Sequence, residues 1–352
     1  MSSEESIIGC VLGTALGDAV GLPCEGLSRE RGRKLFPAIQ GPNLFRNRGM
    51  VSDDTEHTCI VAQALVASAG DTEIFEREMA QRLRAWILCL PVGVGLATLK
   101  AGLKLCVGVS PGRSGVWSAG NGPAMRSALL GVCFGHDIDK LRALVRANTL
   151  LTHLDPKAEW GAFAVALAAH FAAAQSVFSP HEYSCALREQ LGEAANEFLD
   201  LIDQIVASVD AGDDTQTFAA QIGCEKGVSG YTLHTVPVAL HAAWSHPDDF
   251  RDAVLSVVRC GGDADSTAAI TGAIVGARVG KTGLPVEWLQ SICEWPRSLD
   301  WMENLARQLA QVMESSKTQK PISVSVFALV PRNMFFLVIV LMHAARRAFP
   351  PY

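Results

Sequence analysis

The sequence predicts an all-α protein, a compact bundle of many helices. Apolar residues recur at helical spacing through most of its 352 residues, whereas alternating β-branched patterns bounded by turn residues are scarce. The hydrophobic fraction is 49% but the aromatic fraction only 7%, so we expect a core of Ala, Leu, Val and Ile in closely packed helices. No Pro/Gly/Ser-rich linker divides the first part of the chain. We therefore predict one helical domain over 1–314, followed by a linker and an apolar carboxyl-terminal segment over 315–352.

Apolar periodicity defines the expected helices, and two of them share an unusual pattern of small residues. Glycine costs about 1 kcal/mol against alanine inside a helix, so small residues at every fourth position indicate close approach of another backbone. The same spacing marks helix dimers in lipid, but Asp18 and Arg278 within these helices favour a water-soluble core. The two stripes are Gly9, Gly13, Gly17, Gly21 and Ala268, Gly272, Gly276, Gly280. The helices are expected over 6–20, 54–69, 72–88, 94–106, 123–134, 138–150, 157–174, 180–191, 194–209, 232–243, 250–259, 266–279, 286–293 and 299–314.

Charge and cysteine usage exclude several classes of function. Lys plus Arg number 30 and Asp plus Glu 36, a formal net charge of -6, so no overall basic field exists to hold nucleic acid. The 10 cysteines are scattered singly, without the short spacings of a zinc site or a disulfide framework. The amino terminus is acidic where a secretory signal would be basic. These observations predict a cytoplasmic protein with reduced thiols.

The carboxyl-terminal segment is strongly apolar over 324–330 and 334–345. Pro331, Arg332 and Asn333 interrupt it before it reaches the ~18 continuous apolar residues that indicate a membrane span. We expect a helix docked on the domain, with association of the tail with a membrane as the alternative.

Ser52, Asp53 and Asp54 stand immediately before a periodic apolar run, so their side chains lie at a helix start. One interpretation is capping, because Asp53 with Glu56 three residues later fits a capping box and acidic groups favour the positive end of the helix dipole. The other interpretation is a ligand set for a cation.

Asp263, Asp265 and Ser266 repeat this arrangement on a glycine-led turn that opens another helix. Carboxylates gathered in one place repel one another unless a cation neutralises them. Mg²⁺ and Mn²⁺ prefer such oxygen ligands. Two segments of this kind predict a metal site, and neither has the spacing of an EF-hand calcium loop.

The two acidic segments resemble the paired signatures of the ADP-ribosylhydrolase family, Ser-Asp-Asp-Thr near the start and Gly-Gly-Asp-Ala-Asp-Ser near the end. Other segments agree in the same order. Residues 12–21 look like the first helix of the family, 120–126 like its substrate loop, and Thr152-His153 like a further family element. The resemblance covers 7 to about 312, and the combination is specific although each fragment alone is weak.

The resemblance implies an orthogonal multi-helix bundle with a cleft that holds two divalent cations, Mg²⁺ or Mn²⁺. It also implies hydrolysis of the bond between ADP-ribose and the side chain of an ADP-ribosylated protein, or a related small ADP-ribosyl conjugate. Carried over by position, the metal ligands are Ser52, Asp53, Asp54, Asp263, Asp265 and Ser266. The catalytic base is Asp53, Asp54 or Glu25.

The substrate-binding residues implied by the resemblance are Gly120, Asn121 and Gly122, where bare backbone can approach a diphosphate or ribose. An ordinary loop before the helix at Pro123 is the alternative for these residues. Some relatives place an aromatic residue directly before this loop, where this chain has alanine, and nearby Trp117 could replace it. His153 either contacts the nucleotide or hydrogen-bonds a carbonyl at a helix end.

Two other functions compete with hydrolysis. A catalytically silent ADP-ribose or nucleotide sensor would retain the cleft, and a helical scaffold would act through its apolar tail. Because every motif lies earlier, we expect removal of the residues after about Ser315 to leave the metal site intact.

Overall fold

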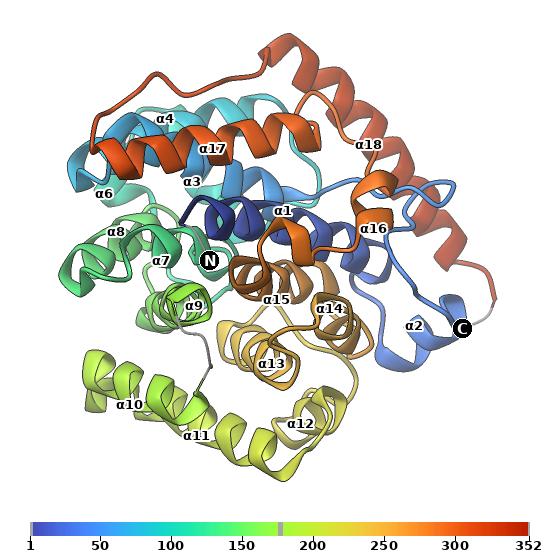
Figure 1. Ribbon diagram of the computed structural model, residues 1–352. Helices are drawn as coiled ribbons and strands as arrows, with labels where there is room; N and C mark the ends of the chain where they lie inside the picture. The colour runs from blue at the N-terminus through green and yellow to red at the C-terminus, as the bar shows by residue number, and fades with distance from the viewer. Residues whose placement is uncertain (1–2, 175–178, 351–352) are drawn as a thin grey trace.

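The two helices with small-residue stripes lie antiparallel at the centre of the fold (Figure 1): α1 (Ser3–Gly21) and α15 (Ala264–Val279). A Cβ atom added at Gly17 would lie 2.0 Å from the carbonyl oxygen of Ala268, and equally close backbone contacts continue along both stripes. Backbone therefore touches backbone along this seam. The end of α1 at Gly21 consequently meets the start of α15.

The computed structural model describes residues 3–174 and 179–350. Within these residues the chain is helical, with isolated β-bridges but no paired strands. The predicted all-α class is confirmed. The remaining α-helices are α2 (Arg29–Leu35), α3 (Asp53–Ser68), α4 (Thr72–Leu88), α5 (Leu96–Cys106), α6 (Pro111–Ser114), α7 (Ala128–Phe134), α8 (Ile138–Leu150), α9 (Pro156–Ala174), α10 (Pro180–Leu191), α11 (Asn196–Ala211), α12 (Thr215–Gln221), α13 (Thr232–Ser245), α14 (Phe250–Val258), α16 (Val286–Ser291), α17 (Leu299–Ser315) and α18 (Val326–Arg347). Short 3₁₀ turns are η1 (Leu22–Cys24), η2 (Ala124–Arg126), η3 (Glu193–Ala195) and η4 (Lys281–Gly283).

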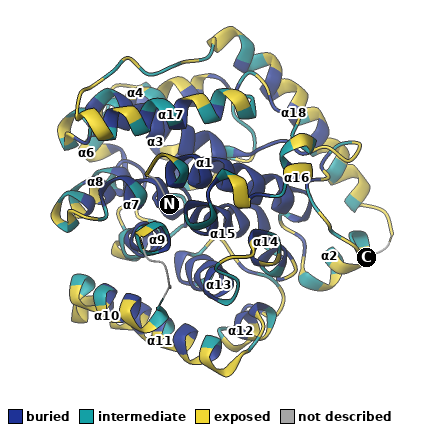
Figure 2. Ribbon diagram, viewed as in Figure 1, coloured by how far each residue is buried: buried dark blue, intermediate teal, exposed yellow. Residues whose placement is uncertain are grey.

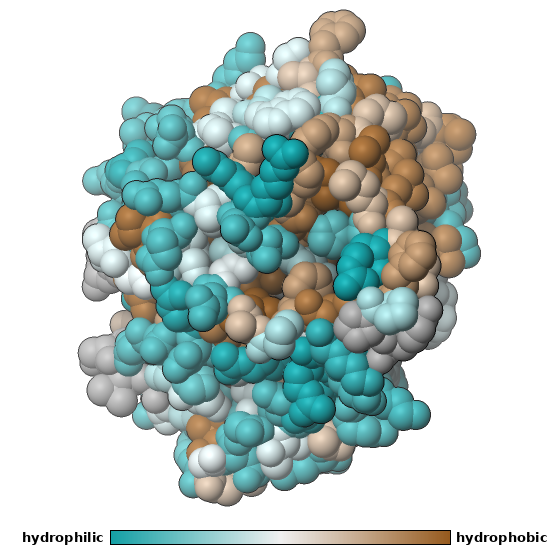
Figure 3. All heavy atoms as spheres, turned by 90° about the vertical axis from the view of Figure 1, so that its right-hand side faces the viewer, coloured by the Kyte–Doolittle hydropathy of each residue, from teal (hydrophilic) through white to brown (hydrophobic). Residues whose placement is uncertain are grey.

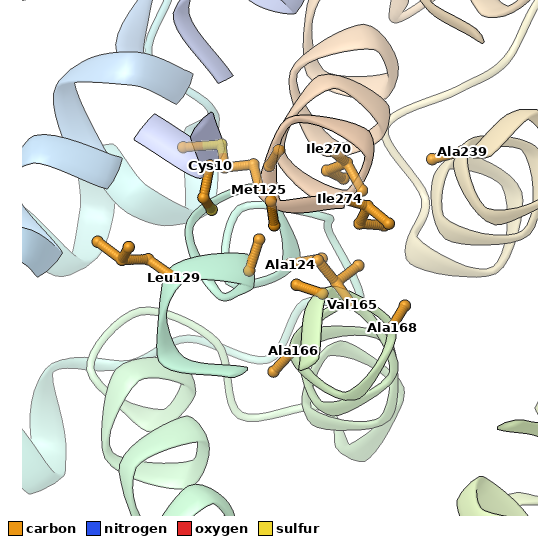
Figure 4. Packing of buried hydrophobic residues seen from close by; sticks show 14 of the residues in the cluster. Cys10, Ala124, Met125, Leu129, Val165, Ala166, Ala168, Ala239, Ile270 and Ile274 are labelled. Atoms are coloured by element: carbon orange, nitrogen blue, oxygen red, sulfur yellow. The ribbon is translucent and has the colours of Figure 1, made fainter. Parts of the chain in front are cut away.

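The core surrounds α1 and α15, which are buried along nearly their whole length (Figure 2). Small side chains allow neighbouring helices to approach closely, as Figure 4 shows where Val165 and Ala166 of α9 lie near Ile270 and Ile274 of α15. Met125, on η2, points into the same cluster. Close packing of this kind holds the amino-terminal ends of α3 and α15 in fixed relation.

The structure corrects several expected elements. The helix expected over 123–134 is two elements, η2 and α7, that meet at Ser127, whose hydroxyl donates to the carbonyl of Pro123 at 2.8 Å. The helices α2, α6 and α12 were not expected. All three are short, and α2 buries no residue, so apolar periodicity gives no signal there.

Candidate active site

A cleft of about 540 Å³ opens where the amino-terminal ends of α3 and α15 meet. Its size suits a small-molecule ligand. Most of the predicted site residues line it, together with residues of the segments before α5 and α13. The lining residues are Glu25, Gly26, Asp53, Gly93, Gly95, Leu96, Ala97, Thr98, Ser118, Gly120, Asn121, Gly122, Met125, His153, Val228, Ser229, Gly230, Gly262, Asp263, Asp265 and Ser266.

The first acidic segment begins α3, and its cap is Ser52. The Ser52 hydroxyl accepts from the backbone N–H of Asp54 at 3.3 Å and donates to Asp54 Oδ2 at 3.0 Å. Glu56 does not close a capping box, because its carboxylate instead accepts from Trp86 at 2.5 Å and Arg297 at 2.6 Å. Asp53 is therefore free of the capping role and faces the cleft.

The second acidic segment begins α15 on a turn that requires glycine. Gly262 has φ +81°, and a Cβ atom there would lie 1.9 Å from the carbonyl oxygen of Val228. The tight turn directs Asp263 towards the substrate loop, where its Oδ2 accepts from Asn121 Nδ2 at 2.6 Å. Asp263 makes no capping hydrogen bond with its side chain. Capping thus explains neither Asp53 nor Asp263.

A buried aspartate that the sequence analysis did not assign to the site holds the first segment in place. Asp18, on α1, accepts from the backbone N–H of Ser52 at 2.9 Å and from the N–H and hydroxyl of Thr55. It is the acidic residue of the first glycine stripe. This position could have identified Asp18, because a carboxyl group buried in a close helix contact needs hydrogen-bond partners.

The carboxyl groups of the site share a buried environment that disfavours their charged forms. Burial, and then the neighbouring carboxylates, raise the pKa of Asp54 and of Asp265 well above the usual range. Burial raises the pKa of Asp18 to about 6, although hydrogen bonds from Thr55 oppose the shift. Burial and then Asp263 raise the pKa of Glu25 to about 7. Burial is thus the main cause of all four shifts, and neighbouring carboxylates add to it at Asp54, Asp265 and Glu25.

The donor atoms fit divalent cations. Across residues 3–174 and 179–350 no three His, Cys, Asp or Glu side chains form a compact ligand group by themselves. Two buried carboxylate oxygens, Asp54 Oδ1 and Asp265 Oδ1, nevertheless lack any hydrogen-bond partner. The hydroxyls of Ser52 and Ser266 add neutral oxygens, and such oxygens with carboxylates are the ligands of Mg²⁺ and Mn²⁺.

The substrate loop lies against His153, which explains its glycines. A Cβ atom at Gly120 would lie 3.0 Å from His153 Nε2, and one at Gly122 would lie 3.0 Å from its Cε1. Burial lowers the pKa of His153 to about 3, so the ring is neutral. Arg126 donates to the Thr152 hydroxyl at 2.8 Å, and this hydroxyl lies 2.9 Å from His153 Nδ1. We assign the ring proton to Nε2, because the Thr152 hydroxyl can then donate to Nδ1.

Two predicted residues occupy contrasting positions. Glu25 follows η1 and lines the cleft. Trp117 is 75% exposed and is not among the residues that line the cleft. His57, on α3, is buried with its Nδ1 3.0 Å from Arg126 and packs edge-on against Trp86.

The segment that precedes Ser52 is held in place by hydrogen bonds from α18. Arg332 donates to both carboxylate oxygens of Glu294, at 2.8 and 2.7 Å, and to the carbonyl of Val51 at 2.6 Å. Glu294 also accepts from the N–H of Val51 at 3.2 Å. Both backbone polar groups of the residue before Ser52 are therefore fixed by one buried ion pair. This pairing could not be predicted from the sequence, because Arg332 and Glu294 are 38 residues apart and both contact Val51 far upstream.

Comparisons with known proteins identify the family. An ADP-ribosylglycohydrolase family model matches residues 1–319. An uncharacterized protein of Archaeoglobus fulgidus is 32% identical over 88% of this chain and 97% of its own length. ADP-ribosylarginine hydrolase Tri1 of Serratia proteamaculans is 27% identical over 86% of this chain and 78% of its own. ADP-ribosyl-[dinitrogen reductase] glycohydrolase of Rhodospirillum rubrum is 24% identical over 83% and 91%.

The fold has a solved counterpart. A chain of an ADP-ribosylglycohydrolase-related protein complex superposes with a TM-score of 0.66 at 24% identity, covering 88% of this chain and 99% of that one. This likeness concerns the fold, whereas the family match spans both acidic segments and the substrate loop. The chain belongs to the ADP-ribosylglycohydrolase family.

Proposed function

We propose that this protein is a metal-dependent hydrolase that releases ADP-ribose from a modified protein side chain or a related ADP-ribosyl conjugate. The observation that carries the proposal is the pair of unpartnered, buried carboxylate oxygens, Asp54 Oδ1 and Asp265 Oδ1. They belong to two helices that begin at one cleft, and a cation is the simplest group that would satisfy both.

Ser52, Asp53, Asp54, Asp263, Asp265 and Ser266 would hold two Mg²⁺ or Mn²⁺ ions. Such ions, when bound, lower the pKa of a water molecule and polarise oxygen atoms. The residues themselves position the site: Ser52 and Ser266 both donate to Asp54 Oδ2, at 3.0 and 3.2 Å. These bonds leave Asp54 Oδ1 for a ligand.

The proton of the attacking water would pass to a carboxylate at the cleft surface. Asp53 and Glu25 line the cleft, whereas Asp54 lies beneath it and its Oδ2 accepts two hydroxyl hydrogen bonds. A general base must reach the water directly, so the geometry favours Asp53 or Glu25 over Asp54. Negative side chains around the ribose would also stabilise the positive charge that develops at its anomeric carbon.

The nucleotide part of the substrate would lie along the loop of Gly120, Asn121 and Gly122. The N–H groups of Gly120 and Asn121 are bound by Ser118 Oγ and by the carbonyl of Gly230, so the loop would offer the close approach that glycine allows, with the Nε2–H of His153 as a neutral donor beside it. Asn121 links the loop to Asp263 at 2.6 Å, so substrate contacts and cation ligands are joined through one hydrogen bond. Relatives named for ADP-ribosylarginine and for ADP-ribosyl-dinitrogen reductase support this substrate class. A cytoplasmic location stays a prediction.

The test is release of ADP-ribose. The full chain is incubated with a protein bearing ADP-ribosyl-arginine, and separately with one bearing ADP-ribosyl-serine, in Mg²⁺, in Mn²⁺ and in chelator. We expect release from at least one substrate that depends on the cation and is lost in Asp54→Asn. Asp200→Asn, an exposed aspartate on α11, is the matched control and should keep full activity.

The competing function is a silent sensor of ADP-ribose. It predicts that the wild-type chain binds ADP-ribose in a calorimeter but releases none from either substrate under any cation. That result would replace hydrolysis by binding as the function of the cleft.

A further inference from the structure

The helix α18 lies beyond the residues that match the family and has two different apolar faces. One face is buried on the domain through Leu329, Phe336 and Ile339. The other face is open and carries apolar side chains at helical spacing, with Phe327 91% exposed and Leu341 57% exposed. The exposed members of this face are Phe327, Pro331, Met334, Phe335, Val338, Leu341 and Met342.

The open face continues beyond the helix onto neighbouring aromatic residues. The ring of Phe335 lies 6.3 Å from that of Phe45 and 6.4 Å from that of Trp295, measured between centroids. Figure 3 views the molecule from this side and shows hydrophobic side chains gathered over a broad area. Soluble proteins seldom expose a contiguous apolar area of this extent unless it binds something.

The charged Lys and Arg residues of the carboxyl-terminal segment have no acidic residue among them in the sequence. Residues 315–352 contain five Lys or Arg and no Asp or Glu, although the whole chain carries a net charge of -6. At the carboxyl-terminal end of α18 a hollow of about 270 Å³ is lined by three arginines, Arg46, Arg346 and Arg347, with no carboxylate among its lining residues. Met342, which belongs to the open face, lines the same hollow. Apolar contact and a site for an anion are therefore adjacent.

The hydrogen bonds that hold α18 in place determine whether it could lie on a membrane or span it. Within residues 3–174 and 179–350, two helices are long and apolar enough to span one, but the segment with α1 is fully buried while α18 is only 28% buried. Arg332 and Asn333 tie α18 to the domain through Glu294 and through the carbonyl of Cys89, at 2.7 and 2.8 Å. A helix held in this way can lie on a bilayer surface, whereas spanning would require these buried bonds to break.

We propose that the open face of α18 binds the surface of a membrane that contains anionic phospholipid. The apolar side chains enter the boundary between headgroups and acyl chains, and the arginines of the hollow contact the headgroup phosphates. Two copies paired through their carboxyl-terminal segments would cover the apolar side chains but would bring no carboxylate from residues 315–352 to the arginine hollow. This function is separate from the hydrolysis proposed above and does not depend on it.

The test is sedimentation of the full chain with vesicles of phosphatidylcholine alone or with roughly a third of phosphatidylglycerol. We expect at least ~10-fold tighter binding to the anionic vesicles, weakened by added salt. The double variant Phe327→Glu with Leu341→Glu should lose the binding. Val107→Glu is the matched control, because Val107 is 80% exposed but lies after α5, and it should bind like the wild type.

Four results would overturn the proposal, the last of them displacement by inorganic phosphate. The first is a wild-type chain that stays in the supernatant with both vesicles, and the second is equal loss of binding in Val107→Glu. The third is a wild-type dimer in light scattering that Leu341→Glu converts to a monomer, since a second copy then occupies the face. Inorganic phosphate should not displace the vesicles, and displacement by it would assign the hollow to a free anion instead of a lipid.

Discussion

The hydroxyl of Ser266 donates to the carboxylate of Asp54 at 3.2 Å, across 212 residues of sequence. This bond joins the starts of α15 and α3 directly. It also occupies Asp54 Oδ2, so that Oδ1 alone is left without a partner. Substitutions on the two sides of this bond should therefore have matched effects.

Asp54→Asn and Asp265→Asn should each lower ADP-ribose release by at least ~100-fold, because each removes a charged ligand of the proposed cations. Thermal stability of the metal-free protein should stay equal or rise, since burial and like charges already disfavour both carboxylates. Calorimetric titration with Mn²⁺ and thermal unfolding in chelator measure the two effects. Cation-dependent turnover retained in both variants would remove these residues from the site.

Arg332→Met should destabilise the fold by about 3–5 kcal/mol, because it leaves the buried Glu294 carboxylate unpaired. It should also weaken cation binding by ~10-fold or more, since Val51 loses a partner next to Ser52. Urea unfolding and calorimetry are the measurements. Adding Glu294→Gln should restore most of the stability without restoring the cation affinity. If affinity returned together with stability, Arg332 would have no positioning role.

The motifs alone predicted that removal of the residues after Ser315 leaves the metal site intact. The contacts of α18 lead us to expect a different result. The cut would take Arg332 from Glu294 and would expose Leu44 and Met50, which pack against Phe336. We expect a less stable protein with weaker cation affinity. A shortened chain with wild-type stability and cation affinity, measured in the same two assays, would show that α18 is dispensable.

Gly17→Ala should destabilise the protein by at least about 1–3 kcal/mol, because the new Cβ would lie 2.0 Å from the carbonyl oxygen of Ala268. Gly32→Ala is the control, since it lies within α2 with nothing within 4 Å of an added Cβ. The control should gain up to about 1 kcal/mol from helix propensity. Urea unfolding of both variants measures the difference, and losses of similar size would contradict close contact of α1 with α15.

The metal-free protein should lose stability as pH rises from about 4 to about 7, because the buried carboxyl groups of the cleft become charged over this range. The folded pKa values of Asp18 and Glu25, about 6 and about 7, lie above their ordinary values of 3.8 and 4.5. A raised carboxyl pKa contributes stability that is complete below the unfolded value and is lost as pH passes the folded value.

Glu25→Gln isolates this effect from other titrating groups, such as the histidines whose lowered pKa values act in the opposite direction. In chelator, the variant should melt close to the wild type below pH 4.5 and increasingly above it near pH 7. A difference in melting temperature that does not change with pH would contradict the charge crowding described for the cleft.

Much of the bundle could be predicted because long helices repeat apolar residues at their own period. The glycines of α1 and α15 predicted close approach of another backbone, and the structure shows that the two stripes meet each other. The elements missed were those without a buried stripe, such as α2, and the break at Ser127, which depends on a side-chain hydrogen bond to Pro123.

The predicted oxygen ligands form two short motifs, and the structure brings residues of both to one cleft, while their role as ligands stays a prediction. Asp18 was not predicted as a site residue because its hydrogen-bond partners lie 34 and 37 residues away and depend on how α1 packs against α3. Arg332 was not predicted for the same reason, because only the docking of α18 brings its guanidinium to the carboxylate of Glu294. The exposure of Trp117 likewise depends on tertiary packing.

The seam between α1 and α15 has a dynamic consequence. Side chains that form most helix contacts can change rotamer, and the helices can shift as they do. Glycine has no rotamers, so along this line the separation of the two backbones is set by atoms that cannot rearrange. Since α1 carries Asp18 and α15 carries Asp265, both carboxyl groups are held on backbones of fixed separation, and amide hydrogens along the seam should exchange as slowly as any in the protein.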